Sequence, residues 1–490
     1  MSFIQQDLDF YGKKIILSEG KQDSSNEHTY SIIIGKNATG KSRLLANIID
    51  THLKKKSIYQ PSKIIAVTNI LYDKFPAEDK NNNKKYFCFN ARKFYEQSFE
   101  NSFYSRILDP RNRINLGCIE STFAYLGYKA EFSLDLYLNL SFSKIKFVHS
   151  ELEVRDVFSL LSKYSKEIAS EKEEFPWIIK FVDYFNNLNI EDYSRIYMIE
   201  KYDIDYEDSA INEQFLTKLL KYWKYLSKKE VALLVIIKEY YFFNKDLDEQ
   251  VLFEVVEFIN KHIHEKSKKN QQITIDVNLK TVPSKPTISM LMNLEVLQIR
   301  EITFEKIDVH EQIKDTSFSS GEKAIFAMFL NIASEIQDDA LICIDEPEVS
   351  LHPKWQTEFI IKLQEVFSDY KGCHFIIATH SPQIVSGLKS KQGFIVDLEI
   401  NETYLALDYT HKSADYQLAK IFKTPGYNNE YILKSCFRIL SLIKNENPIT
   451  EADKKYIQEL IAFERLLKED DMSLYLIQSV LALLSKEDSK

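Results

Sequence analysis

Short apolar runs alternate with amphipathic stretches in the first and third parts of this chain. Residues 32–34 and 341–344 are apolar throughout, as is typical of strands buried on both faces of a parallel sheet. Residues 41–53 carry apolar positions at helical spacing. These patterns predict an α/β fold. Strands are expected at 15–17, 30–34, 64–68, 86–89, 297–307, 341–344 and 375–378, and helices at 41–53 and 324–336.

The middle and the end of the chain follow a helical period instead. Residues 118–270 are rich in aromatic residues, nearly lack proline and show no repeats. We therefore expect a head made of residues 1–117 and 271–412, a large helical insertion at 118–270, and a helical tail at 413–490 that is a candidate docking site for a partner. The expected helices are 154–165, 177–188, 213–226, 231–243, 249–264, 415–422, 429–443 and 451–467.

The segment directly after residues 32–34 has the spacing GxxxxGK[ST]. Its glycines let the backbone approach phosphates, and its N–H groups point toward negative charge. Lys41 would reach the β- and γ-phosphates of a nucleotide, and the Ser42 hydroxyl would coordinate Mg²⁺. A chance glycine-rich turn is the alternative, which the strand before and the helix after disfavour. The expected phosphate-binding residues are Gly35, Lys36, Asn37, Ala38, Thr39, Gly40, Lys41 and Ser42.

Two adjacent carboxylates follow the apolar strand at 341–344. Asp345 would hold Mg²⁺ through water, and Glu346 would orient or deprotonate an attacking water as the catalytic base. Successive side chains of a strand point to opposite faces, but at its end the next residue can turn toward a nucleotide. An Asp-Glu pair after a strand is often only a solvated strand end. Its pairing with the phosphate loop favours the metal and catalytic roles.

Ser319, Gly321 and Glu322 precede the apolar helix at 324–336. Small residues at a helix N-terminus can form a second phosphate-binding surface. Because the chain already has one phosphate loop, a second anion site indicates a nucleotide presented by another subunit. The alternative is an ordinary helix cap, which Ser319 and Glu322 would also provide.

His380 follows the strand at 375–378. A lone histidine is usually structural. At the end of a core strand, and in this order after the carboxylates, contact with a γ-phosphate is the better interpretation. We therefore expect His380 to act with Glu346 in catalysis.

These four segments resemble the Walker A, signature, Walker B and switch-histidine motifs of ABC-type ATPases. Residues 345–353 are similar to those of the soluble branch, which includes RecF, structural-maintenance-of-chromosomes and OLD-type proteins. The resemblance implies a P-loop ABC-type ATPase head, with ATP and Mg²⁺ as cofactors, that pairs as a homodimer. It also implies that Ser319 and Gly321 contact the γ-phosphate of ATP bound by the partner head, and that Ser350 and His352 lie at the interface.

Two positions depart from the ABC-type pattern. Ala38 stands where many relatives have glycine, and no glutamine of the Q-loop can be placed, Gln97 being the one candidate. The sequence therefore does not identify the residue that would connect a bound nucleotide to the helical insertion.

Residues 66–76 and 86–89 are similar to the early strands of PtuA, the ATPase of Septu phage-defence systems and of some retrons. This resemblance implies a separate HNH nuclease, PtuB, as partner, and a reverse transcriptase with msDNA if the system is a retron. The alternative is a RecF- or SMC-like ATPase that acts on DNA in repair or recombination. This chain shows neither the long heptad arms of cohesin-like proteins nor an HNH-like histidine cluster.

Composition narrows these classes further. The 490-residue chain carries a net charge of −9, which argues against a general nucleic-acid coat protein. Lysine clusters at 54–56 and 266–269 are typical of solvated helix ends, although a basic groove for DNA stays open. The scattered cysteines and the lack of a long apolar run predict a cytoplasmic protein that does not enter the membrane.

Overall fold

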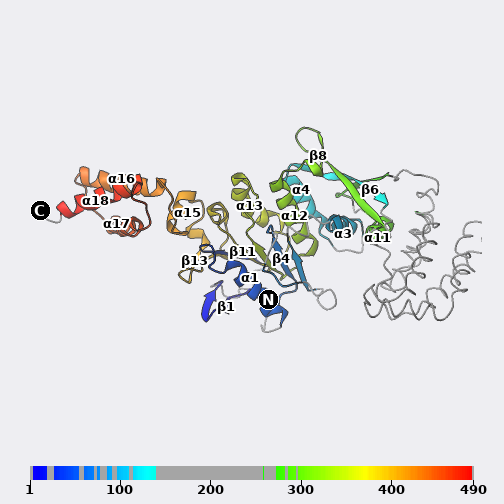
Figure 1. The fold of residues 1–490 in the computed structure, drawn as a ribbon, viewed down its shortest axis with the longest axis horizontal. Helices are drawn as coiled ribbons and strands as arrows, with labels where there is room; N and C mark the ends of the chain where they lie inside the picture. The colour runs from blue at the N-terminus through cyan, green and yellow to red at the C-terminus, as the bar shows by residue number, and fades with distance from the viewer. Residues whose placement is uncertain are drawn as a thin grey trace, which may run out of the picture.

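A mixed seven-stranded sheet forms the centre of the head (Figure 1). The computed structural model describes residues 4–18, 27–54, 60–70, 74–77, 85–90, 97–109, 114–138, 258, 272–281, 285–293 and 296–487. The strands lie in the order β13-β12-β3-β11-β10-β4-β5, all parallel except β13. Their bounds are Thr29–Ile34 (β3), Ile64–Thr68 (β4), Tyr86–Phe89 (β5), Leu341–Asp345 (β10), His374–Ala378 (β11), Gly393–Asp397 (β12) and Glu402–Leu405 (β13).

The two faces of this sheet belong to two separate apolar cores. Ile33 of β3 and Leu341 and Cys343 of β10 share a core with α1 (Lys41–Leu53), whereas Ile32 and its neighbours two residues away face the other core. Because side chains alternate along a strand, Asp345 falls on the same face as Cys343. The last carboxylate of β10 therefore points toward the helix that follows the phosphate loop.

Helices cover both faces of the sheet. The hairpin of β1 (Asp7–Phe10) and β2 (Lys13–Ile16) packs beside α1 on one face. The opposite core contains buried side chains from the other helices of the head, and the helix that starts at the signature segment contributes more of them than any other single helix. Those helices are α3 (Gln97–Leu108), α4 (Leu116–Tyr125), α11 (Pro286–Asn293), α12 (Ser320–Glu335), α13 (Pro353–Val366) and α14 (Pro382–Gly387).

A second, antiparallel sheet packs in the larger apolar core of the head, with its strands in the order β7-β6-β8-β9. Its strands are β6 (Tyr128–Leu138), β7 (Gln272–Asn278), β8 (Leu297–Lys306) and β9 (Gln312–Lys314). The assignment of residues 128–138 to a helical segment is therefore wrong. Buried residues recur there at every second position, which is the period of a strand with one face in the core.

Most element predictions for the head are confirmed. The helix at 41–53 and the strands at 64–68 and 86–89 have the predicted bounds, and the other predicted strands are shifted by one or two residues. The helices expected between 154 and 264 lie outside the described residues, so the division at 118 and 270 stays a prediction. Within the described ranges, no helix combines the length and apolar character that crossing a bilayer requires.

The tail consists of helices with a core of their own at the far end of the molecule (Figure 1). Buried residues of four helices, among them Ala419, Ile439, Phe463 and Ile477, form this core. Ile421, just after the first tail helix, packs in the head core instead. The tail helices are α15 (Ala414–Lys420), α16 (Glu430–Lys444), α17 (Glu451–Glu464) and α18 (Met472–Glu487).

Replacing Ile439 with alanine should destabilise the tail and spare the head. The fully buried side chain would leave a cavity that costs about 2–5 kcal/mol. Amide hydrogen exchange in α16 should accelerate, while exchange in α1 should stay unchanged. Phe437→Ala, on the same helix but at a side chain that is 58% exposed, is the matched control. Equal acceleration in α1 would contradict a separate tail core.

Candidate functional site

The phosphate loop connects β3 to α1 and is held open by its own hydrogen bonds. Thr39 Oγ1 donates to the main-chain oxygen of Lys36 at 2.9 Å, and Lys36 Nζ pairs with Glu399 at 3.0 Å. Gly35 has a φ of 151°, and a Cβ there would stand 2.7 Å from Thr39 Oγ1. Glycine is therefore required at the start of the loop for space as well as for conformation.

Ala38 has a φ of 67°, in the left-handed region. That conformation costs an alanine roughly 1–2 kcal/mol. Alanine in place of the glycine of many relatives therefore adds strain at position 38, while the backbone keeps the left-handed conformation that a glycine would adopt easily. Ser350 and Glu346, both in the segment after β10, are strained in the same way, with φ values of 69° and 46°. Strained residues of this kind gather where function fixes the backbone.

Lys41 lies inside the loop that it serves. Its Nζ donates to the main-chain oxygens of Gly35 at 3.0 Å and Lys36 at 3.4 Å, and lies 2.6 Å from Nε2 of His380. Burial lowers the pKa of Lys41, and the surrounding carboxylates, Glu346 first, oppose this effect. The Lys41 ammonium therefore bonds to protein groups that the phosphates of a bound nucleotide would replace.

Burial and the nearby Lys41 ammonium lower the pKa of His380. The ring is therefore neutral at pH 7, and its Nε2 accepts a hydrogen bond from Lys41, which leaves the hydrogen on Nδ1. Glu346 Oε1 lies 3.8 Å from the same Nε2. The two residues that the sequence predicts to be catalytic are therefore neighbours.

Glu346 faces the cavity because the backbone turns directly after β10. Its φ of 46° breaks the alternation of the strand, and its N–H donates to the main-chain oxygen of Ala378 at 2.9 Å. The turn brings Glu346 next to Asp345 although the two would point apart in a regular strand. The predicted turn at this strand end is confirmed.

Asp345 is 1% exposed, and no hydrogen bond reaches its Oδ1 within the described part of the chain. Burial raises the pKa of its carboxyl to about 6, against the effect of a hydrogen bond from Ser42. A buried carboxylate oxygen without a partner, next to a hydroxyl, is the kind of oxygen donor set that Mg²⁺ accepts. Asp345 and Ser42 therefore fit a magnesium ion.

These residues line one cavity of about 280 Å³ between the phosphate loop and the ends of β10 and β11. A second cavity of about 330 Å³ adjoins the first, since Arg43 and Lys74 line both cavities. The sequence predicts no cavity role for these two cations or for Ile70, because no phosphate-binding motif includes them, although Ile70 and Lys74 lie in the PtuA-like segment 66–76. The first cavity is lined by Asn37, Ala38, Gly40, Lys41, Ser42, Arg43, Ile70, Lys74, Asp345, Glu346 and His380.

The signature segment does not line this cavity. Ser319 is the N-cap of α12 and forms a reciprocal capping box with Glu322, with bonds of 3.2 Å and 2.8 Å. A Cβ on Gly321 would stand 2.8 Å from the Ser350 main-chain oxygen and 2.7 Å from Trp355. The structure therefore shows the helix cap. The second anion site stays a prediction. His352 likewise caps α13.

Part of this chain matches a known family model. Residues 285–386 match the family model described as "AAA domain, putative AbiEii toxin, Type IV TA system". The match includes the signature segment, the carboxylates after β10 and His380, and it leaves out the phosphate loop. It spans too little of the chain to assign the whole protein to that family.

Three curated relatives match shorter stretches. The retron Vc95 probable ATPase of Vibrio cholerae serotype O1 biovar El Tor is 26% identical over 191 residues, which is 36% of this chain and 35% of that protein. The retron Ec83 probable ATPase of Escherichia coli is 33% identical over 84 residues, 15% of each chain. Septu protein PtuA of Bacillus mycoides (strain KBAB4) is 23% identical over 161 residues, 29% of this chain and 21% of that protein.

This chain is similar to the ATPases of retron and Septu systems. The predicted resemblance is confirmed at modest identity. The aligned part covers at most 35% of any of these three relatives. Among solved structures, the Smc head domain with a coiled coil and joint from Pyrococcus yayanosii is 12% identical, with a TM-score of 0.17 over 62% of this chain and 56% of that one.

Asp345→Asn should stabilise the protein in the absence of Mg²⁺ near neutral pH. The folded chain keeps the Asp345 proton up to about pH 6, against about pH 4 for an unfolded Asp. Its contribution to stability is therefore full below about pH 4 and lost as the pH rises through about 6. The variant should raise the free energy of unfolding by up to about 3 kcal/mol at pH 7.5 and change it little at pH 4.

Urea denaturation at the two pH values measures this effect. Asp453→Asn is the control of opposite sign, because hydrogen bonds with Thr450 lower the pKa of Asp453, so it stabilises the fold above its unfolded pKa. That control should lower stability at pH 7.5. A loss of stability in Asp345→Asn at pH 7.5 would contradict the conclusion that the buried, charged Asp345 carboxylate destabilises the ligand-free fold.

Proposed function

We propose that this chain binds and hydrolyses Mg-ATP. One observation carries the proposal: a phosphate-loop lysine, a metal-fitting carboxylate with its hydroxyl, a second carboxylate and a histidine all line one cavity. Ser42 and Asp345 would hold Mg²⁺, which would neutralise charge on the phosphates. The similarity to retron ATPases supports the same activity.

The chain's own groups account for the chemistry. The Glu346 carboxylate accepts a proton from a water whose oxygen bonds to the γ-phosphorus, and the bond from that phosphorus to the bridging oxygen breaks as ADP leaves. Lys41 moves from the loop oxygens to the phosphates. His380 then needs a hydrogen on Nε2 to meet the γ-phosphate, so it binds a proton or changes tautomer when nucleotide enters.

The nucleoside would extend into the second cavity. Tyr11 lies in the two-residue turn between β1 and β2, has a φ of 49° and is 75% exposed. Its hydroxyl accepts from Arg43 at 3.4 Å, and both residues line the second cavity. An exposed ring at the exit of a phosphate site offers a base a stacking surface.

The position of the signature segment supports a homodimer with composite sites. Ser319 and Ser350 are exposed and lie outside the cavity of their own chain. The N-terminus of a helix such as α12 attracts anions. We infer that Ser319, Gly321 and Glu322 meet the γ-phosphate of ATP held by a second copy, which would order the two heads around two nucleotides.

The biological role that we propose is anti-phage defence. The similarity to Septu protein PtuA and to the retron ATPases supports it. In this role the ATPase would hold and control a separate HNH nuclease of the PtuB kind, with a reverse transcriptase and msDNA as further partners in a retron. The tail, whose core is separate from that of the head, is the candidate docking site.

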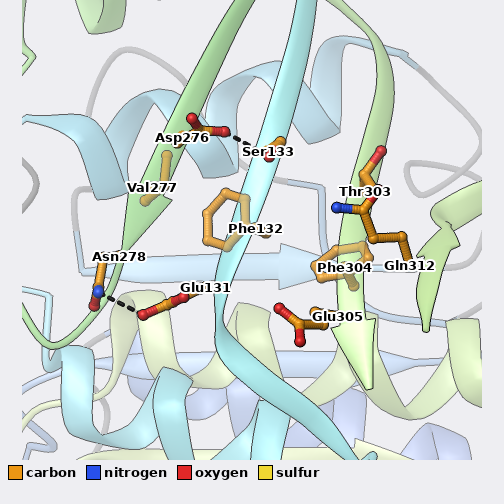
Figure 2. A pocket seen from close by; sticks show the side chains of 10 residues that line it. All are labelled: Glu131, Phe132, Ser133, Asp276, Val277, Asn278, Thr303, Phe304, Glu305 and Gln312. Atoms are coloured by element: carbon orange, nitrogen blue, oxygen red, sulfur yellow. Dashed lines mark hydrogen bonds between the residues drawn. The ribbon is translucent and has the colours of Figure 1, made fainter. Parts of the chain in front are cut away.

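Direct action on DNA, as in RecF- or SMC-like repair, has less support. The outward face of the second sheet is hollowed by a cavity of about 320 Å³ that carries Glu131, Asp276 and Glu305 (Figure 2). Lys129 pairs with Glu305 and is thereby neutralised. Within the described residues, Glu131 and Asp276 accept hydrogen bonds from the neutral side chains of Asn278 and Ser133, so their negative charge stays on this face (Figure 2). Such a face repels phosphates, which disfavours this sheet as a DNA-binding surface.

Glu346→Gln should bind ATP but lose about 10²–10⁴ in turnover, because the amide cannot take the proton of the lytic water. Trapped ATP should also hold two heads together, which light scattering would detect. Lys41→Ala is the comparison variant and should lose nucleotide binding by calorimetry, since the phosphates lose their main cation. Unchanged affinity in Lys41→Ala, or unchanged turnover in Glu346→Gln, would contradict the assignment.

A chain that ends at residue 425 should lose the nuclease but keep ATP binding. This truncation keeps Ile421, which packs in the head core, and α15, which contacts both α14 and α16, and it removes the three helices that supply the rest of the tail core. Co-purification of the neighbouring gene products with full-length and truncated chains tests docking, and a plaque assay with Lys41→Ala tests defence. If the full-length chain carries no nuclease and Lys41→Ala protects as well as wild type, a repair-type ATPase becomes the better account.

A further inference from the structure

Two loops that leave the sheet side by side are joined through one carboxylate. Glu348, two residues after the catalytic Glu346, accepts a hydrogen bond from the His380 N–H at 2.5 Å. Its other oxygen accepts from the Thr379 hydroxyl at 2.8 Å. Thr379 Oγ1 in turn accepts from the Ser381 N–H at 2.9 Å. The whole turn that carries His380 is thus held by Glu348.

A second connection joins the same loops one step farther from the cavity. Gln356, on the first turns of α13, accepts from the Ser381 hydroxyl at 2.8 Å through its side-chain oxygen. Its amide nitrogen donates to the main-chain oxygen of Leu351 at 3.0 Å. The segment 348–351 and the turn 379–381 are therefore connected at two points, once through Glu348 and once through Gln356.

Glu348 does not line the nucleotide cavity. Burial raises the pKa of Glu348, while the hydrogen bonds from His380 and Thr379 oppose this effect. Keeping a carboxylate away from water is costly unless its oxygens are satisfied. The site therefore retains a costly residue that does not line the cavity and whose side-chain hydrogen bonds to other residues, as described, lead to the turn of His380.

The same segment also meets the signature helix. The Ser350 main-chain oxygen lies so close to Gly321 that a Cβ there would approach it to 2.8 Å. A displacement at the N-terminus of α12 would press on Ser350, two residues from Glu348. This contact and the hydrogen bonds of Glu348 form one continuous path from the signature segment to His380.

We propose that Glu348 is a positioning residue that fixes the backbone of His380, so that the imidazole stays beside Glu346 and the γ-phosphate, and that segment 348–351 passes contacts at the signature helix to this histidine. This inference rests on the proposed ATP hydrolysis. Positioning matters because a misplacement of about 1 Å can lower a rate by about 10²-fold.

A double-mutant cycle tests whether Glu348 acts through His380. Glu348→Gln keeps the shape but offers one acceptor in place of two, so the amide nitrogen must face either a main-chain N–H or a hydroxyl donor. It should lower kcat about tenfold or more and leave the affinity for a non-hydrolysable ATP analogue within threefold. His380→Ala should lower kcat about 100-fold. The double variant should be no slower than His380→Ala, since the histidine that Glu348 positions is gone.

Control variants separate positioning from loss of fold. Thr379→Ser keeps the hydroxyl and should retain kcat, whereas Thr379→Val removes it and should lower kcat in part. Asp453→Asn, a tail carboxylate with similar bonds to a threonine, should lower the Tm without lowering kcat.

Three results would overturn the inference. They are a kcat of Glu348→Gln within twofold of wild type, fully additive losses in the double variant, and a loss of analogue binding that parallels a fall in Tm. If the wild-type chain binds the analogue but hydrolyses no ATP, the proposed function fails, and the inference fails with it. Hydrolysis by wild type with additive losses removes the inference alone.

Discussion

Parallel pairing of β11 with both β3 and β10 is the constraint on which the site depends. In register, Ile33 of β3 lies opposite Ala378, and Ala378 lies opposite Asp345 of β10. All three strands therefore end at one edge of the sheet. The phosphate loop, the two carboxylates and His380 each follow one of these ends. Residues more than 300 positions apart in the sequence thereby line one cavity of about 280 Å³.

Several residues at this edge of the sheet have a strained backbone or a buried charge. Ala38 and Glu346 have backbones in the left-handed region, and Asp345 keeps an oxygen without a hydrogen bond from the described residues. Each of these features lowers the stability of the ligand-free fold. All of them lie around the place where phosphates and a metal ion would supply the missing partners. The head is thus organised for a bound state, as functional sites commonly are.

The helix N-terminus at Ser319 has two interpretations that do not exclude each other. The capping box with Glu322 and the close packing of Gly321 explain these residues within one chain. The same packing places the main chain of α12 against the segment after β10. A helix end used for packing can therefore also respond to an anion at its tip, which would link the proposed composite site to the loop that Glu348 holds.

Local chemistry determined much of this protein from the sequence alone. The spacing of Gly35, Gly40 and Lys41, the apolar strand before Asp345 and the apolar strand before His380 each predict their own element, because every such signal lies within a few neighbouring residues. Three features required the tertiary structure. Residues 128–138 alternate apolar and polar positions at the period of a strand, but their pairing with strands near residues 272 and 297 follows only from the fold. Lys74 joins the cavity from a loop without a chemical motif. Glu348 binds the turn of His380 across a separation of 32 positions. Such contacts depend on which strands become neighbours in the sheet, and local sequence pattern does not carry that information.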